Sequence, residues 1–262
     1  MVIAKDYDRI SNKHVFGGLC MKTTAIILAG GTGQRMKTNG LPKQFLSLFG
    51  KPIICFTIEK FENCPDVDQI VIPCNSEWID HMRKLVDRFN FKKVIAVIPG
   101  GKDRQESVTK GLSVLDDPSD EDIVLIHDGV RPLVMPEIIS ENIRVARENG
   151  NAMTVKQNIE TVVVTEKDTA DFEDFKNRDN TYVLTAPQTF RVNELLEVYK
   201  QCEGVEPNGV PLLDASLMYA YLGKKVFLVK ETGLNLKITT PEDFYYLRSY
   251  LELQENKNIF GV

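Results

Sequence analysis

Short apolar runs alternate with longer amphipathic segments along this chain, and this alternation constrains the possible folds most strongly. The apolar runs, rich in β-branched residues, are Ala25–Leu28, Gln69–Pro73, Val94–Ile98 and Ile123–Ile126. Helical patterns follow these runs at Ile53–Phe61, Glu77–Phe89, Ser107–Leu115 and Pro136–Asn149. Nearly continuous apolar strands separated by helices are typical of a parallel sheet that is buried on both faces. We therefore expect an α/β fold with a Rossmann-like, mostly parallel sheet flanked by helices.

The pattern changes after Ala152. Residues Val155–Thr165 alternate between apolar and polar side chains, and Tyr182–Thr185 is the next apolar run. The stretch between them, centred on Lys167–Asn177, has too few apolar residues to pack in a core. This predicts a β-arm over about 155–184 that projects from the domain, with a flexible surface loop as the alternative. The expected remaining elements are helices near Asn193–Cys202, Asp214–Leu222 and Glu242–Gln254 and a strand at Val226–Val229.

Composition limits the class of protein. The 262 residues carry a net charge of −5, which argues against general nucleic-acid binding because such proteins present a basic surface. No apolar run approaches the ~20 residues that a membrane-spanning helix needs. The five cysteines lack Cys-x-x-Cys spacing, so we expect reduced thiols in a cytoplasmic protein without structural zinc. Residues 1–20 are expected to be a disordered extension, followed by a single domain over residues 21–255.

A glycine-rich turn follows the first predicted strand. It contains Gly30, Gly31 and Gly33, and the cations Arg35 and Lys43 come shortly after it. Backbone N–H groups and two cations in one place suit the phosphates of a nucleoside triphosphate. A dinucleotide-binding turn would have a third glycine after this point, and a P-loop would end in Gly-Lys-Ser/Thr. The glycines alone fit a plain strand-to-helix turn equally well, but the two cations favour phosphate transfer.

Two further polar motifs follow predicted strands. One is Gly100-Gly101-Lys102-Asp103-Arg104, and the other is His127-Asp128-Gly129-Val130-Arg131-Pro132. Ligands of parallel sheets bind at the carboxyl ends of the strands, so we expect both motifs to lie near the glycine turn. Each motif also has a purely structural interpretation, as a tight turn for the glycines and as a salt bridge for the Asp128–Arg131 pair.

Together with later motifs, these residues resemble the CTP-dependent cytidylyltransferases that act on sugar-alcohol phosphates. The resemblance runs from Met21 to about Leu251. Its motifs are Leu28-Ala29-Gly30-Gly31-x-Gly33-x-Arg35-Met36, Pro42-Lys43-Gln44-Phe45, Gly100-Gly101-x-x-Arg104-x-x-Ser107-Val108, His127-Asp128-x-x-Arg131-Pro132, Pro187-Gln188-x-Phe190 and Asn235-Leu236-Lys237-Ile238-Thr239. It implies the fold of the nucleotide-diphospho-sugar transferases and the transfer of CMP from CTP to a polyol phosphate with release of pyrophosphate.

The resemblance also implies roles for individual residues. The catalytic cations would be Arg35, Lys43, Arg178 and Lys237. The nucleotide would be bound by Leu28, Ala29, Gly30, Gly31, Gly33, Gly101, Arg104 and Ser107. The polyol phosphate would be bound by Asp128, Arg131, Thr161 and Thr185. Magnesium would accompany CTP, with Asp128 as a candidate ligand. Arg178 and Thr161 lie on the predicted arm, and in relatives Arg178 serves the neighbouring subunit's site, which implies a homodimer that forms through the arm.

The expected chemistry needs no general base. The attacking phosphate oxygen is already anionic at neutral pH, so the protein must bring two anions together and stabilise the negative charge that spreads in the transition state.

Departures from the family pattern concern the acceptor side. Ala186 stands where threonine is frequent, Leu212-Leu213-Asp214 keeps one carboxylate, and Glu160 replaces an aspartate. Thr185 offers a nearby hydroxyl, although it is expected on the other face of its strand. The motifs Leu28-Ala29-Gly30-Gly31 and Val130-Arg131-Pro132 are more similar to the ribitol-phosphate branch than to the methylerythritol-phosphate branch. We therefore expect D-ribitol 5-phosphate as the acceptor, with 2-C-methyl-D-erythritol 4-phosphate as the alternative.

Two other classes of function stay open from the sequence. One is a non-catalytic nucleotide-binding paralogue, which the presence of Arg35, Lys43, Arg178 and Lys237 disfavours. The other is a sugar nucleotidyltransferase that uses UTP or ATP, because such enzymes share the glycine-rich turn.

Overall fold

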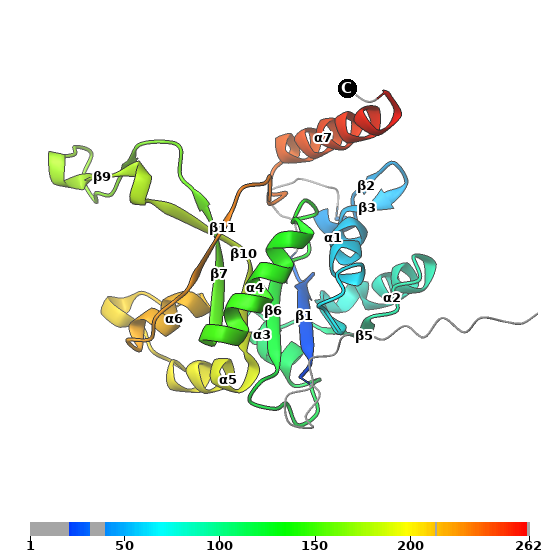
Figure 1. The fold of residues 1–262 in the computed structure, drawn as a ribbon, viewed down its shortest axis with the longest axis horizontal. Coiled ribbons are helices and arrows are strands. Elements are labelled where there is room, and N and C mark those ends of the chain that lie inside the picture. Colours follow the sequence, from blue (N-terminus) through cyan, green and yellow to red (C-terminus); the bar gives the residue numbers. More distant parts are fainter. Residues whose placement is uncertain (1–20, 32–39, 213, 261–262) are drawn as a thin grey trace, which may run out of the picture.

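The chain folds around one seven-stranded sheet. The computed structural model describes residues 21–31, 40–212 and 214–260, so the expected extension at residues 1–20 lies outside it (Figure 1). The sheet has the strand order β11-β7-β10-β6-β1-β4-β5. These strands are β1 (Thr23–Leu28), β4 (Gln69–Cys74), β5 (Val94–Pro99), β6 (Ile123–Asp128), β7 (Asn151–Gln157), β10 (Tyr182–Arg191) and β11 (Leu228–Glu231).

Strand directions confirm the mostly parallel sheet that the sequence predicts. Strand β1 pairs in parallel with β4 and β6, β4 with β5, and β11 with β7. Strand β10 is the exception, because it runs antiparallel to both β6 and β7. It is longer than the predicted Tyr182–Thr185 run, since Pro187 and the polar Gln188 interrupt the apolar pattern while the backbone continues through a register shift between Leu184 and Gln188.

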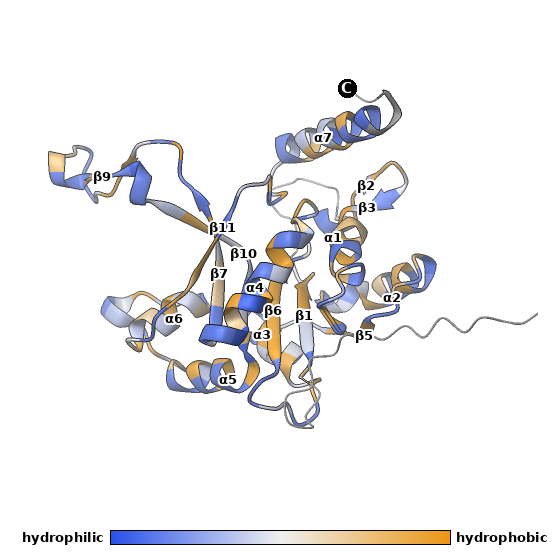
Figure 2. Cartoon of the chain, viewed as in Figure 1, coloured by the Kyte–Doolittle hydropathy of each residue, from blue (hydrophilic) through white to orange (hydrophobic). Residues whose placement is uncertain are grey.

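Helices cover both faces of the sheet. The helices are α1 (Ile53–Glu62), α2 (Ile79–Arg88), α3 (Arg104–Leu112), α4 (Pro136–Asn149), α5 (Val192–Gln201), α6 (Ala215–Tyr221) and α7 (Pro241–Phe260). Helices α1, α2 and α4 pack with Ala25 and Ile27 of β1 in one core, while α3, α5 and α6 pack with Ile26 in another. Consecutive residues of β1 thus point to opposite faces, as strand geometry requires, and the strand is apolar because both faces are covered. Figure 2 shows β1 and β6 in this apolar centre.

A hairpin extends from the sheet between β7 and β10 (Figure 1). At its base Gln157 pairs with Tyr182, and further out β8 (Val162–Val163) pairs antiparallel with β9 (Phe175–Lys176). Strand β9 falls in the segment that the sequence marks as too polar for a core. It forms nonetheless because backbone pairing, and not burial, holds it, and its residues are exposed. We call residues 158–181 the arm.

Smaller elements complete the described chain. A 3-10 turn at Lys43–Phe45 leads into the short strands β2 (Ser47–Leu48) and β3 (Lys51–Pro52). Helix α7 contributes Leu247 to a third apolar cluster, which includes Leu48 and Ile238. Among the residues described, no helix is long and apolar enough to cross a membrane.

Candidate active site

The three polar motifs meet at one edge of the sheet. Strands β1, β5 and β6 all end there, and Leu28 at the end of β1 pairs with Asp128 at the end of β6. A cavity of about 340 Å³ opens between the segments that follow these strands. It is lined by Leu28, Ala29, Gly30, Gly31, Lys43, Gln44, Gly101, Lys102, Asp103, Arg104, Ser107, Asp128, Val130 and Lys237. Most of the residues that the sequence assigns to nucleotide binding therefore share one cavity with Asp128 and Lys237.

The start of the glycine turn is held by Gln44. The buried amide Nε2 of Gln44 donates to the carbonyl of Ala29 at 2.7 Å and to the carbonyl of Gly31 at 3.0 Å. With their carbonyls engaged, Ala29 and Gly31 keep a fixed backbone conformation beside Lys43, which follows the turn on the adjacent 3-10 segment. Gln44 stands inside the Pro42–Phe45 motif but has no predicted role of its own. The predicted site residues Gly33 and Arg35 lie outside the described residues.

The loop after β5 is shaped by Ser107 and Gly101. The Oγ atom of Ser107 accepts from the Gly101 N–H at 2.9 Å and donates to the carbonyl of Asp103 at 2.7 Å. A Cβ atom at Gly101 would lie 2.4 Å from Cβ of Glu106, so this close approach requires glycine. Asp103 then caps α3 by accepting from the Glu106 N–H at 2.8 Å. The loop is therefore preorganised, with Arg104 at the first residue of the helix.

Asp128 lies between cations. Its Oδ2 atom is 2.8 Å from Nε of Arg131 and 3.2 Å from Nζ of Lys237. Burial opposes ionisation, but the positive charges of Lys237, Arg104 and Arg131 outweigh it and lower the pKa of Asp128 below its usual range. Asp128 is therefore an anion at neutral pH. The ion pair that was the structural interpretation of Asp128 and Arg131 does form, and it lies at the cavity.

His127 anchors the loop that carries Arg131. Its ring is fully buried against Phe61, and Nε2 lies 3.2 Å from the carbonyl of Arg131. Burial lowers the pKa of His127 from 6.5 to about 4, although the Asp128 charge and the Arg131 carbonyl act in the other direction. A neutral imidazole that donates from Nε2 to this carbonyl fits these observations. His127 is therefore a structural support of the site and does not reach the cavity.

Arg131 is not among the residues that line this cavity and is linked to it through Asp128, and the predicted residues on the arm and in β10 do not line it either. Arg178 and Thr161 are exposed on the arm, and Nε of Arg178 is 3.8 Å from Oδ1 of the adjacent Asp179. Thr185 Oγ1 lies 3.3 Å from the carbonyl of Thr154 and 3.2 Å from Oε1 of Glu231, so its hydroxyl is engaged within the protein. Within one chain, the structure thus brings the nucleotide residues together with Asp128, Arg131 and Lys237 and leaves the arm residues apart.

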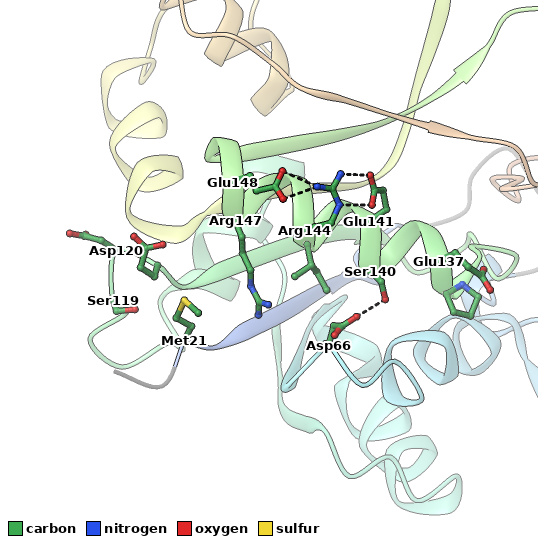
Figure 3. Close-up of a pocket in the computed structure, with 13 residues that line it drawn as sticks. Met21, Asp66, Ser119, Asp120, Glu137, Ser140, Glu141, Arg144, Arg147 and Glu148 are labelled. Atoms are coloured by element: carbon green, nitrogen blue, oxygen red, sulfur yellow. Dashed lines mark hydrogen bonds and ion pairs between the residues drawn. The ribbon is translucent and has the colours of Figure 1, made fainter. Parts of the chain in front are cut away.

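A larger concave surface lies at the opposite edge of the sheet. It encloses about 1330 Å³ between α4 and the segments that precede β1, β4 and β6, where Met21, Asp66 and Asp120 lie (Figure 3). Of its two cations, Arg144 and Arg147, the first is paired with Glu141 and Glu148. Carboxylates outnumber cations there, which disfavours a polyphosphate ligand, and ligands of parallel sheets bind at the carboxyl ends of the strands. The smaller cavity is therefore the candidate active site.

The described residues hold no cluster of three or more His, Cys, Asp or Glu side chains arranged to bind a metal ion. The cavity does present the carboxylates of Asp103 and Asp128. This fits Mg²⁺, which takes few protein ligands and is completed by substrate phosphates and water.

Sequence comparison gives the same assignment as the resemblance noted from the motifs. Residues 23–253 match the family described as IspD, 2-C-methyl-D-erythritol 4-phosphate cytidylyltransferase. The chain is 39% identical over 243 residues to a ribitol-5-phosphate cytidylyltransferase of Streptococcus agalactiae serotype V, covering 92% of this chain and 100% of that protein. It is 40% identical over 238 residues to one from Vibrio parahaemolyticus, covering 90% and 99%.

Solved structures support the fold. The 4-diphosphocytidyl-2C-methyl-D-erythritol synthase of Anaerococcus prevotii superposes with a TM-score of 0.76 at 25% identity, covering 88% of this chain and 96% of that one. The 2-C-methyl-D-erythritol 4-phosphate cytidylyltransferase of Francisella tularensis has a TM-score of 0.67 at 24% identity, covering 87% and 99%. The fold and the family match define a nucleotidyltransferase. The chain belongs to the 2-C-methyl-D-erythritol 4-phosphate cytidylyltransferase family, and it is a cytidylyltransferase.

Proposed function

We propose that this enzyme transfers CMP from CTP to D-ribitol 5-phosphate, giving CDP-ribitol and pyrophosphate. The main support for this proposal is that Gly30 and Gly31 of the glycine turn line the same cavity as Lys43, Asp128 and Lys237. Two anionic substrates can meet there with cations at both ends. The choice of acceptor is supported by relatives that are called ribitol-5-phosphate cytidylyltransferases and are 38–40% identical over most of this chain.

The reaction is an in-line displacement at phosphorus. An oxygen of the acceptor phosphate attacks the α-phosphorus of CTP and forms the new P–O bond. The bond from that phosphorus to the bridging oxygen breaks, and pyrophosphate leaves with the electron pair. A phosphate monoester has its second pKa near ~6 and is therefore largely ionised at neutral pH, so no side chain has to remove a proton. Catalysis then depends on positioning and on electrostatic stabilisation.

Each part of the cavity has a task in this reaction. Backbone N–H groups of the glycine turn and the ammonium group of Lys43 bind the triphosphate, together with Arg35. The loop of Gly101, Arg104 and Ser107 holds the cytidine. Arg131 and Lys237 orient the acceptor phosphate, and the ionised Asp128 keeps both cations in place while its carboxylate accepts from polyol hydroxyls. Bound Mg²⁺ would neutralise triphosphate charge, with Asp128 as its candidate protein ligand.

We also propose that the active unit is a homodimer. The arm carries exposed apolar side chains, including Ile159, which is 73% exposed, and Phe172, which is 88% exposed. A second copy of the chain would cover these side chains and would receive Arg178 and Thr161 next to its own acceptor site.

The cysteine thiols bear on the location of the protein. The thiols of Cys55, Cys64, Cys74 and Cys202 are buried and form no disulfides, which suits a cytoplasmic location.

Measurement of pyrophosphate release decides between the acceptors. The purified enzyme with Mg²⁺ is supplied with each of the four ribonucleoside triphosphates and with D-ribitol 5-phosphate or 2-C-methyl-D-erythritol 4-phosphate. We expect turnover with CTP and with ribitol phosphate. The family description and the solved structures favour methylerythritol phosphate as the second candidate, and equal or faster turnover of it would reverse the choice of acceptor. CTP binding without release for any acceptor would instead indicate a non-catalytic paralogue.

A further inference from the structure

A buried carboxylate outside the cavity is tied to its acceptor end. Glu231 is the last residue of β11 and is 8% exposed. Its Oε2 atom accepts from Nδ2 of Asn235 at 2.8 Å, and its Oε1 atom accepts from the Thr185 hydroxyl at 3.2 Å. Burial raises the pKa of this carboxyl, and its hydrogen bonds and the charges of Arg131 and Lys156 counter that effect only in part. A buried acid of this kind needs a structural or functional reason.

Asn235 connects three segments that meet at the acceptor end. Its Nδ2 group also donates to the carbonyl of Ala186 in β10, and the backbone carbonyl of Asn235 accepts from Nη1 of Arg131 at 2.8 Å. Both neighbours of Nδ2 are acceptors, so the orientation of the amide is fixed. Asn235 thus ties the end of β11 to β10 and to the loop after β6.

The same segment carries Lys237. This residue follows Asn235 by two positions, and the next residue, Ile238, donates its N–H to the carbonyl of Val130 at 2.9 Å. The segment between β11 and α7 is therefore fixed at Asn235 and again at Ile238. Lys237 lies between these two points, with Nζ 3.2 Å from Asp128.

We propose that Glu231 is a positioning residue that acts through Asn235 to hold Arg131 and Lys237 at the acceptor end of the site. This inference rests on the proposed function, since it takes these two cations as ligands of the acceptor phosphate. Glu231 touches neither substrate. Its effect should therefore fall on the acceptor and leave CTP unaffected.

The test compares Glu231→Ala with Glu231→Gln. Glutamine keeps an oxygen for Asn235 Nδ2, and its amide can donate to Thr185 while the Thr185 hydroxyl turns to the carbonyl of Thr154, which lies within 3.3 Å. Alanine removes the partner. Because the buried Asn235 amide loses one of its two hydrogen-bond acceptors, we expect the KM for the polyol phosphate to rise roughly tenfold or more in Glu231→Ala. The KM for CTP should stay within about twofold, and Glu231→Gln should stay close to the unaltered enzyme.

Two further variants test whether Glu231 acts through Asn235 and provide a control. Asn235→Ala should raise the same KM, and the double variant should be no worse than the more affected single variant, because the two residues act as a unit. Glu203→Ala, which changes an exposed glutamate in the turn after α5, is the matched control and should change neither KM. Melting temperatures show that each variant is folded. Equal rises in both KM values, no change in Glu231→Ala, or a glutamine variant as impaired as the alanine variant would overturn the proposal.

Hydrogen exchange separates this inference from the proposed function. If the unaltered enzyme releases no pyrophosphate with any polyol phosphate, the proposed function fails. Amide hydrogen exchange then tests by itself whether Glu231 holds the segment after β11 in place. Faster amide exchange over residues 232–240 in Glu231→Ala, with unchanged exchange at Gly100 and Gly101, would then support it. Unchanged exchange over residues 232–240 would overturn it.

Discussion

At the scale of single residues, the site depends on one anion among cations. Asp128 would be costly to bury alone, and Arg131 and Lys237 remove that cost by pairing with it. In return, the carboxylate fixes two long side chains that would otherwise lose more rotamer freedom on binding a phosphate. The arrangement is thus preorganised for an anion, as electrostatic catalysis requires.

Removal of Lys237 should disable transfer without unfolding the protein. Its side chain is 43% exposed and Arg131 stays paired with Asp128 in the variant, so Lys237→Ala should cost little stability. Loss of a charge that stabilises the transition state should reduce kcat/KM for the acceptor by roughly a hundredfold. Steady-state kinetics measure this, and Lys225→Ala, at an exposed lysine before β11, is the matched control. Activity within about twofold of the unaltered enzyme would contradict the role given to Lys237.

His127 should make the stability of the fold depend on pH. The unfolded chain takes up a proton at this ring near pH 6.5, whereas the folded chain does so only near pH 4. Between these values the unfolded state binds more protons, so the free energy of unfolding should fall as the pH drops from 6.5 to 4. The fall attributable to His127 is at most about 3 kcal/mol.

Urea unfolding at a series of pH values measures this dependence. His127→Gln removes the titrating ring and should flatten the curve in this window, even if the variant is less stable throughout. An unchanged slope in His127→Gln would show that other groups cause the dependence.

At the scale of elements, the arm decides whether the site is shared. Arg178 and Thr161 are exposed and lie away from the cavity of their own chain, while Lys237 lines it. If the arm reaches a second copy, each site combines Lys237 of one subunit with Arg178 of the other.

Mixing two inactive variants tests this directly. Arg178→Ala and Lys237→Ala homodimers should each be nearly inactive. After unfolding and refolding together, half of the dimers are hybrids, and each hybrid has one intact site. The mixture should therefore recover about a quarter of the activity per site, because assembly of a two-fold dimer is random. Activity no greater than the sum of the separate variants would exclude a shared site.

The helices and strands could be predicted where the pattern of apolar residues within a single element reveals them. Apolar strands such as Ala25–Leu28 and the pattern of α4 can be recognised from burial on one or two faces. Strand β10 could not be traced beyond Thr185, because Gln188 owes its place to pairing with β6 and β7, and Pro187 lies in the register shift between Leu184 and Gln188. Propensity gives no sign of such long-range pairing.

The residues that line the site could be predicted from the sequence, but the hydrogen bonds that support them from distant segments could not. Gly101 lies in the loop after β5, Ser107 in the helix that follows this loop, and Asp128 at the end of β6, so the sheet topology alone brings them together. The support by Gln44 and by Glu231 depends on side chains that contact segments distant in sequence, such as Glu231 with Thr185. Neither residue carries a local signal of that role.

In the molecule as a whole, one sheet carries the residues that we propose for both substrates. The glycine turn follows β1, Asp128 ends β6, and Lys237 follows β11, so these residues belong to strands of the same sheet or to the segments that follow them. Cores on both faces of the sheet keep these strand ends in register.

CTP should therefore stabilise the entire fold. A ligand at a hundred times its Kd adds about 2.7 kcal/mol, which corresponds to a rise of roughly 5–10 °C in Tm for a domain of this size. Thermal unfolding with Mg²⁺ and each of the four triphosphates checks this. CTP should give the largest rise, and a larger rise with UTP or ATP would favour a different nucleotidyltransferase.

Attack of the acceptor phosphate on the α-phosphorus of CTP can be followed by isotope transfer. The enzyme is supplied with Mg²⁺, unlabelled CTP and D-ribitol 5-phosphate whose phosphate oxygens are ¹⁸O. Mass spectrometry then measures the masses of the products. We predict CDP-ribitol that carries all of the label, together with unlabelled pyrophosphate. Labelled pyrophosphate, or release of CMP without CDP-ribitol, would contradict the account.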